Sequence, residues 1–158
     1  MPNPSIDSTL SQSDIAEVKE AFAKVLQKLP FLVNLTASER KTTFKAGPDS
    51  LSFITNALTA AQDNPNILPI SFTTAAFQRD VDLFNVLTEL SILAASVASQ
   101  IDDTRIAVGA EAMQQAAQVY SYVKTAAKTT PGLKPIAEQL GERFQKASKP
   151  KKTSTPTP

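Results

Sequence analysis

The sequence predicts an all-α protein, folded as an antiparallel helical bundle of about four main helices with one or two short capping helices. Three observations predict this fold. Apolar residues recur at steps of three and four over several long segments, which is the spacing of one helix face. Prolines and capping residues divide the chain into segments of helical length. No segment alternates with the period of a strand for more than a few residues.

The first helix is predicted over the stretch SQSDIAEVKEAFAKVLQKLP, with Ser13 as its N-cap. Asp14 and Glu17 suit the start of a helix because its dipole attracts negative charge there. Pro30 disfavours the helical conformation at Leu29 and should end the helix. The predicted apolar face consists of Ile15, Val18, Phe22, Val25, Leu26 and Leu29.

The densest apolar stretch of the chain, LPFLVNL, follows this helix. Exposed to water, it would form a larger apolar patch than monomeric proteins normally tolerate. Phe31, Leu32 and Leu35 are therefore predicted to plug one end of the bundle. An interface with a partner or a second copy, and the rim of a pocket, are the alternatives.

A short helix is predicted next, because TASE (residues 36–39) matches the capping-box pattern. This helix should run to about Phe44, and Gly47 can end it in a left-handed conformation. The following helix is predicted from about Asp49 to Gln62, where the prolines of DNPNILP stop it.

Residues 75–129 contain no proline and a single glycine. One helix over this span would be roughly 80 Å long at 1.5 Å per residue, without a sustained heptad to support it. A turn is therefore predicted near residues 99–104, where polar residues interrupt the apolar spacing and Asp103 can cap a second arm.

These elements place the bundle domain at residues 12–146, with its last helix over residues 134–146. A flexible N-terminus (residues 1–11) precedes the domain, and a disordered basic Pro/Ser/Thr tail (residues 147–158) follows it. With 158 residues, of which 42% are hydrophobic, the chain is long enough to bury a core.

The composition excludes most catalytic chemistry. The chain has no cysteine and no histidine, which removes thiolate catalysis, the usual metal ligands and the commonest general base. Asp80 and Asp82 would point about 200° apart on a helix and could not share a site. We therefore predict no catalytic residue, no metal and no cofactor. An enzyme that uses only carboxylates and lysines, with Asp102 and Asp103 as the residues to test, is the remaining alternative.

Charge and hydropathy bear on partners and location. A net charge of +1 disfavours nucleic acid as a partner, although the basic tail could contact an acidic one. The longest apolar segment, residues 90–101, is interrupted by polar residues and too short to cross a bilayer. The first residues lack the basic and apolar pattern of a signal peptide. A soluble cytoplasmic protein without a membrane span is predicted.

Three segments carry a resemblance: LPFLVNLTASERK, KAGPDSLSFITNALTAAQDNP and DDTRIAVGAEAMQQAAQVYSYVKTAAK. Together they resemble a group of small, uncharacterised bacterial helical proteins with an LPFLxxLTxxER element. The resemblance covers roughly residues 15–145. It implies a soluble helical fold and no known activity.

Two candidate sites remain. The first is an interaction surface formed by the apolar stretch and the connector NILPISF, with Phe31, Leu32, Ile67, Leu68, Ile70 and Phe72 as its residues. The second is an anion contact at the start of the helix near residue 50, where free amides and the helix dipole attract negative charge. Its residues are Arg40, Lys41, Lys45 and Ser50. Asp49 lies in the same turn and opposes anion binding.

The function predicted from these features is that of a non-enzymatic helical interaction or scaffold protein, whose partner is an unknown protein or a second copy. The alternative is a bundle that binds a small apolar or amphipathic ligand between its helices, with Tyr120 and Tyr122 as polar contacts. The two differ observably, because a ligand carrier should copurify with additional mass.

Overall fold

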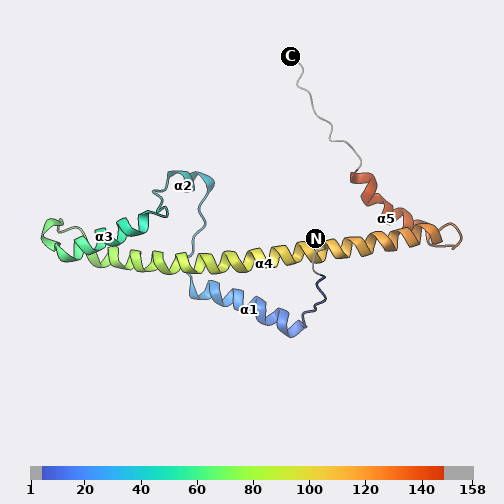
Figure 1. Cartoon of the computed structure of the whole chain (residues 1–158), viewed down its shortest axis with the longest axis horizontal. Coiled ribbons are helices and arrows are strands. Elements are labelled where there is room, and N and C mark those ends of the chain that lie inside the picture. Colours follow the sequence, from blue (N-terminus) through green and yellow to red (C-terminus); the bar gives the residue numbers. More distant parts are fainter. Residues whose placement is uncertain (1–4, 148–158) are drawn as a thin grey trace, which may run out of the picture. The chain divides into compact units, whose positions relative to one another are not determined.

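The computed structural model describes residues 5–147, which form five α-helices, one short 3-10 helix and no strand. The all-α prediction is therefore confirmed for this part of the chain. The helices, shown in Figure 1, are α1 (Gln12–Lys28), α2 (Ala37–Thr42), α3 (Ser50–Asp63), η1 (Pro65–Ile67), α4 (Thr74–Ala126) and α5 (Lys134–Ala147). The predicted tail, apart from Ala147, lies outside the described residues.

The chain divides into two units that share α4. The central unit is Ser8–Ser99, with α1, α2, α3 and the first part of α4. The terminal unit combines Met1–Asp7 with Gln100–Pro158, and contains the second part of α4 together with α5.

The N-cap of helix α1 lies two residues before the predicted one. Ser11, and not Ser13, is the N-cap, because its hydroxyl oxygen accepts a hydrogen bond from the Asp14 amide at 3.0 Å. The Ser13 hydroxyl lies inside the helix and donates to a Glu17 carboxylate oxygen at 3.4 Å. The end of the helix is as predicted: Leu29 leaves the helical region, with φ −118° and ψ 61°, before Pro30.

The capping box of α2 is confirmed. The Glu39 amide donates to the Thr36 hydroxyl at 3.2 Å, and the Thr36 amide donates to the Glu39 carboxylate at 2.8 Å. The helix ends at Thr42, short of Phe44, where threonine hydroxyls bond to backbone carbonyls of the preceding turn.

The conformation expected for Gly47 is wrong. Among the described glycines only Gly132, in the turn between α4 and α5, has a positive φ, of 88°. The Gly47 amide instead donates to the Ser50 hydroxyl oxygen at 2.9 Å. The chain therefore enters α3 through a side-chain hydrogen bond, without a left-handed residue.

The turn predicted at residues 99–104 is also wrong, because α4 is helical throughout (Figure 1). Its polar residues find partners within the helix. Asp102 pairs with Arg105 at 2.6 Å, and the Thr104 hydroxyl donates to the Gln100 carbonyl at 2.7 Å. Without proline, and with these bonds available, nothing in this stretch favours leaving the helix.

The buried core of the described residues is small. In the central unit, Leu58 and Ala61 of α3 and Val81 of α4 are 5–7% exposed. A hydrogen bond of 2.6 Å from the Gln62 amide nitrogen to the Gln78 amide oxygen joins the same two helices. The rings of Phe72 and Phe77 pack edge to face, with their centroids 6.2 Å apart.

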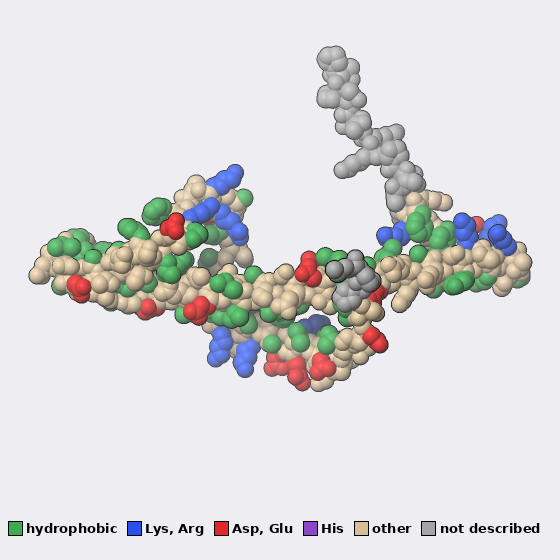
Figure 2. Space-filling model, in the orientation of Figure 1, with side chains coloured by type: hydrophobic (Ala, Val, Ile, Leu, Met, Phe, Trp, Pro, Cys, Tyr) green, Lys and Arg blue, Asp and Glu red, His purple; other side chains and the backbone are tan. Residues whose placement is uncertain are grey.

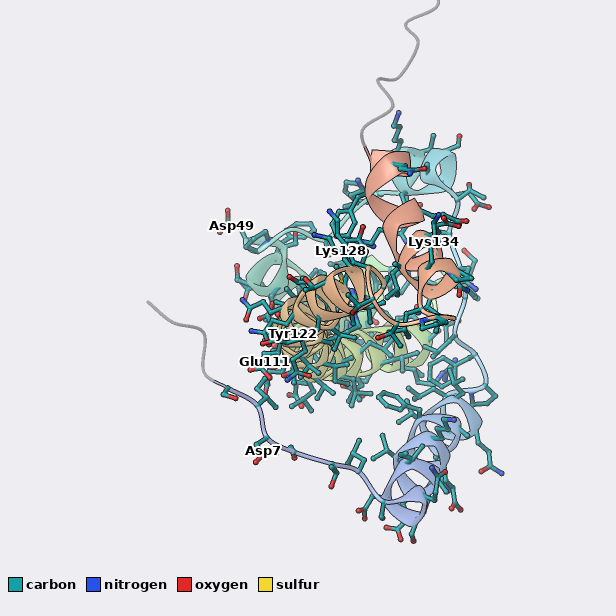
Figure 3. All side chains as sticks on the ribbon, turned by 90° about the vertical axis from the view of Figure 1, so that its right-hand side faces the viewer. Asp7, Asp49, Glu111, Tyr122, Lys128 and Lys134 are labelled. Carbon is teal, nitrogen blue, oxygen red and sulfur yellow. The ribbon has the colours of Figure 1, made fainter. Side chains whose placement is uncertain are left out.

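In the terminal unit, α5 contacts α4 through an aromatic pair. The rings of Tyr120 and Phe144 stack with centroids 5.4 Å apart. Gly141 permits this approach, because a β-carbon at that position would lie 3.0 Å from the Tyr120 hydroxyl oxygen. Figure 3 shows Tyr122 on the side of α4 away from α5.

Candidate interaction surface

The predicted plug of the bundle is not formed. Phe31 and Leu32 are each 48% exposed, and Leu35 is similarly exposed. The prediction that these side chains are buried is therefore wrong. They follow the end of α1, where no neighbouring helix of the described chain covers them fully. Their exposure leaves open the alternatives of an interface and a pocket rim.

The six residues of the predicted interaction surface are largely exposed, and they belong to two separate segments of the chain. Phe31 and Leu32 follow α1, whereas the other four lie in and after η1, in the connection from α3 to α4. Ile67 is 73% exposed and Ile70 is completely exposed, while Leu68 is half-buried. Phe72 is held by its contact with Phe77.

Apolar exposure extends well beyond those six residues. On α1, the side chains of Val18, Phe22, Val25 and Leu26 are about half exposed. Figure 2 shows hydrophobic side chains at the surface along several helices. The exposed large apolar residues of α4 within the central unit are Leu83, Phe84, Val86, Leu90, Ile92, Leu93 and Val97.

The structure also contains a groove that the sequence did not indicate. Its volume is about 920 Å³, and it lies between α4 and the segment that enters α3. Leu51 of α3 and Phe84, Leu87 and Ile92 of α4 supply apolar lining, and Glu89 supplies one carboxylate. The spacing of Leu51 and Phe84 indicates helix faces, but only their placement opposite each other creates the groove.

A second, smaller cavity of about 420 Å³ lies in the terminal unit. Its lining combines small and amide side chains of α4 with Ser5 of the N-terminal segment. The Ile6 amide donates to a Glu111 carboxylate oxygen at 3.1 Å, which fixes this segment on α4. Figure 3 labels Glu111 on the helix and Asp7 on the segment.

The residues of the predicted anion contact do not form one site. The Arg40 Nε donates to the Leu35 carbonyl at 3.3 Å, and the Ser50 hydroxyl accepts from Gly47. Lys41 and Lys45 are exposed. Because two of the four polar groups bond within the chain, they are not directed together at a common anion.

The acidic side chains of the described residues are the remaining candidates for a site. No group of three or more Asp and Glu side chains within residues 5–147 is arranged to hold a metal ion. The pKa of Glu39 lies below its ordinary value, because the Thr36 amide and hydroxyl donate hydrogen bonds to its carboxylate. This shift belongs to the capping box of α2 and stabilises a helix end.

Within the described residues, α4 is long and apolar enough to cross a membrane by length and composition alone. An 18-residue window of it has a mean hydropathy of 1.5, and 6% of that window is buried. The segment considered too short, residues 90–101, lies inside this longer helix. The absence of a membrane span therefore stays a prediction.

Comparisons with known proteins supply no further assignment. No family model, no curated protein and no solved structure matches this chain. The resemblance to uncharacterised bacterial helical proteins stays a prediction.

Proposed function

We propose that this protein is a non-enzymatic helical interaction or scaffold protein that self-associates through its exposed apolar surface. One observation carries the proposal. Within residues 5–147, three apolar side chains are buried as a core, while large apolar side chains on α1, α3, α4 and α5 are exposed. Extensive exposure of large apolar side chains is typical of interaction sites, because isolated monomers rarely tolerate large apolar patches.

The free energy available from covering these side chains is considerable. Val86, Leu93 and Val97 of α4 are between 47% and 63% exposed. Burying the exposed parts of these three alone would contribute roughly 2–5 kcal/mol. Covering several such groups together can offset the entropy lost on association.

In the associated state, we propose that the helices form an antiparallel bundle of about four main helices, with α2 as a short capping helix. The amphipathic patterns of α1, α3 and α5 support this arrangement, since each carries an apolar face of the kind that bundles bury. The partner is a second copy, and Phe31, Leu32, Ile67, Leu68, Ile70 and Phe72 belong to the contact surface.

We further propose that the protein is soluble and located in the bacterial cytoplasm, with neither nucleic acid nor membrane as its partner. The near-neutral charge of +1 supports the first exclusion. The absence of a membrane span is tested by flotation with lipid vesicles. Protein that rises with the vesicles and resists extraction by carbonate would overturn it.

The proposed self-association is tested by size-exclusion chromatography with light scattering and by native mass spectrometry. The wild-type chain is expected to exceed the monomer mass of 16.9 kDa. Phe31→Asp and Phe72→Asp should each weaken the assembly. Phe44→Asp is the matched control, because Phe44 is fully exposed and lies outside the proposed surface. A wild-type monomer at high concentration would refute the proposal.

The groove between α3 and α4 favours a second candidate, the binding of a small apolar or amphipathic ligand. Its volume of about 920 Å³ falls within the range of ligand sites. Tyr120 and Tyr122 do not line it. A monomer that carries additional mass in native spectra, and loses it on Leu87→Asp substitution, would support this function over self-association.

A further inference from the structure

We infer that α1 pairs with α1 of a second copy, in antiparallel orientation, and that this contact extends into the residues that follow the helix. The inference rests on the proposed self-association and names its surface. We call this surface the α1 face. It consists of Val18, Phe22, Val25, Leu26, Phe31, Leu32, Val33 and Leu35.

The exposed area of the α1 face suits a dimer. Its eight side chains are between 44% and 78% exposed. Fully burying one large apolar side chain removes on the order of 60–120 Å² of apolar surface from water. A second copy would therefore cover roughly 250–500 Å² of apolar surface on each chain. Since slightly more than half of an interface is apolar, the total is roughly 900–1,800 Å², which overlaps the range of stable interfaces.

The charges of α1 identify the partner as a second copy. The first half of the helix carries Asp14, Glu17 and Glu20 against the single Lys19, and the second half carries Lys24 and Lys28 without an acid. Figure 2 shows the two signs of charge at opposite ends of this helix. Asp14 and Lys28 lie on the same side of the apolar face at 100° per residue. In an antiparallel pair related by a two-fold axis, Asp14 of each copy therefore lies beside Lys28 of the other.

The same charges argue against two other occupants. In a parallel pair, the acidic halves would face each other, and so would the lysines, which is unfavourable. Helices that lie on membrane surfaces carry polar faces rich in Lys and Arg. Helix α1 instead has three acids and three lysines, so its polar face gives an anionic lipid surface no net attraction.

The first test reverses the charges of the full-length chain. Asp14→Lys with Glu17→Lys makes the first half of α1 basic, and Lys24→Glu with Lys28→Glu makes the second half acidic. Each double variant alone should dimerise at least tenfold more weakly than wild type. An equimolar mixture should recover a heterodimer within about tenfold of wild-type affinity, measured by analytical ultracentrifugation.

The mixture separates pairing from the helix dipole, which also favours acids at the start and lysines at the end of a helix. The dipole acts within one chain. If the variants dimerised weakly because their helices were destabilised through the dipole, mixing them would not restore dimerisation. These side chains are exposed, and circular dichroism of each variant checks that its helix content is unchanged.

The second test fixes the orientation. Because the chain has no cysteine, one introduced cysteine is unique. Asp14 and Lys28 flank the apolar face on the same side. In an antiparallel pair, Asp14→Cys on one copy therefore lies near Lys28→Cys on the other. A short bis-maleimide should cross-link the mixture of these variants and neither variant alone. Cross-linking of each variant with itself would indicate a parallel pair and overturn the inference.

The outcomes separate this inference from the proposed function. A wild-type monomer at all concentrations overturns both. A wild-type dimer that withstands both charge reversals, but dissociates with Phe72→Asp, overturns the α1 pairing and keeps the proposed self-association. Binding of the wild-type chain to anionic vesicles with loss of the dimer also overturns the pairing.

Discussion

Helices α1 and α3 have similar amphipathic sequences and different surroundings. Helix α3 buries Leu58 and Ala61 and is joined to α4 by the Gln62–Gln78 hydrogen bond, whereas α1 has no buried residue. The connection from α3 to α4 is short and returns the chain directly onto α4, which keeps the entropic cost of the contact small. Two amphipathic helices of one chain thus differ in burial, and the short connection to a neighbouring helix accounts for the burial of α3.

The largest effect is expected where α3 meets α4. Val81→Asp would place an unpaired charge among the buried residues and should lower the unfolding free energy by about 3 kcal/mol or more. Val86→Asp, at a half-exposed position of the same helix, should cost about 1 kcal/mol or less. Urea denaturation at low protein concentration measures both. Equal losses would mean that Val81 is not part of a core.

The contact of α5 with α4 should be of intermediate strength. Phe144→Ala removes the ring that stacks on Tyr120 and should cost about 1–2 kcal/mol in the terminal unit. Phe44→Ala is the control, because that ring is fully exposed. Tyrosine fluorescence during denaturation follows the change. If the emission of the Phe144 variant were identical to wild type throughout, the stacked pair would not exist in solution.

The cap of α1 allows a sharper comparison between neighbouring serines. Ser11→Ala removes the hydroxyl that accepts from the Asp14 amide and should destabilise α1 by about 1 kcal/mol. Ser13→Ala should change the stability by less than about 0.5 kcal/mol, because this hydroxyl caps nothing. Helix content against temperature measures the difference. A larger loss of stability in Ser13→Ala than in Ser11→Ala would indicate that Ser13 is the N-cap.

The smallest effect concerns pH at α2. The folded-state pKa of Glu39 is lowered by hydrogen bonds from Thr36, so the carboxylate stabilises the helix end above the ordinary glutamate pKa. This contribution is lost as the pH falls through the lowered folded-state value. NMR titration of the Glu39 side chain measures the shift. Thr36→Ala should reduce it, because this variant keeps the amide donor and removes the hydroxyl donor. An unchanged titration in that variant would exclude the Thr36 hydroxyl as a cause of the shift.

Features that depend on interactions between residues close in the sequence could be predicted from it. The Thr36–Glu39 capping box and the end of α1 at Pro30 depend on residues within a few positions, and both are confirmed. The continuity of α4 was missed because the polar residues near Asp102 pair along the helix instead of starting a turn.

The candidate site was less predictable than the fold. The exposure of Phe31 and the groove beside Phe84 depend on where distant helices lie, which periodicity does not encode. Composition indicated that apolar faces exist, and it could not show which of them remain uncovered.

The hydrogen bond between Ile6 and Glu111 has a consequence for synthesis on the ribosome. Its two partners are 105 positions apart in the chain. At about 5–20 residues per second, roughly 5–20 seconds separate the translation of one partner from that of the other. The residues of the central unit lie between them and are translated in this interval. The segment around Ile6 therefore finds its place on α4 only after the central unit has been translated.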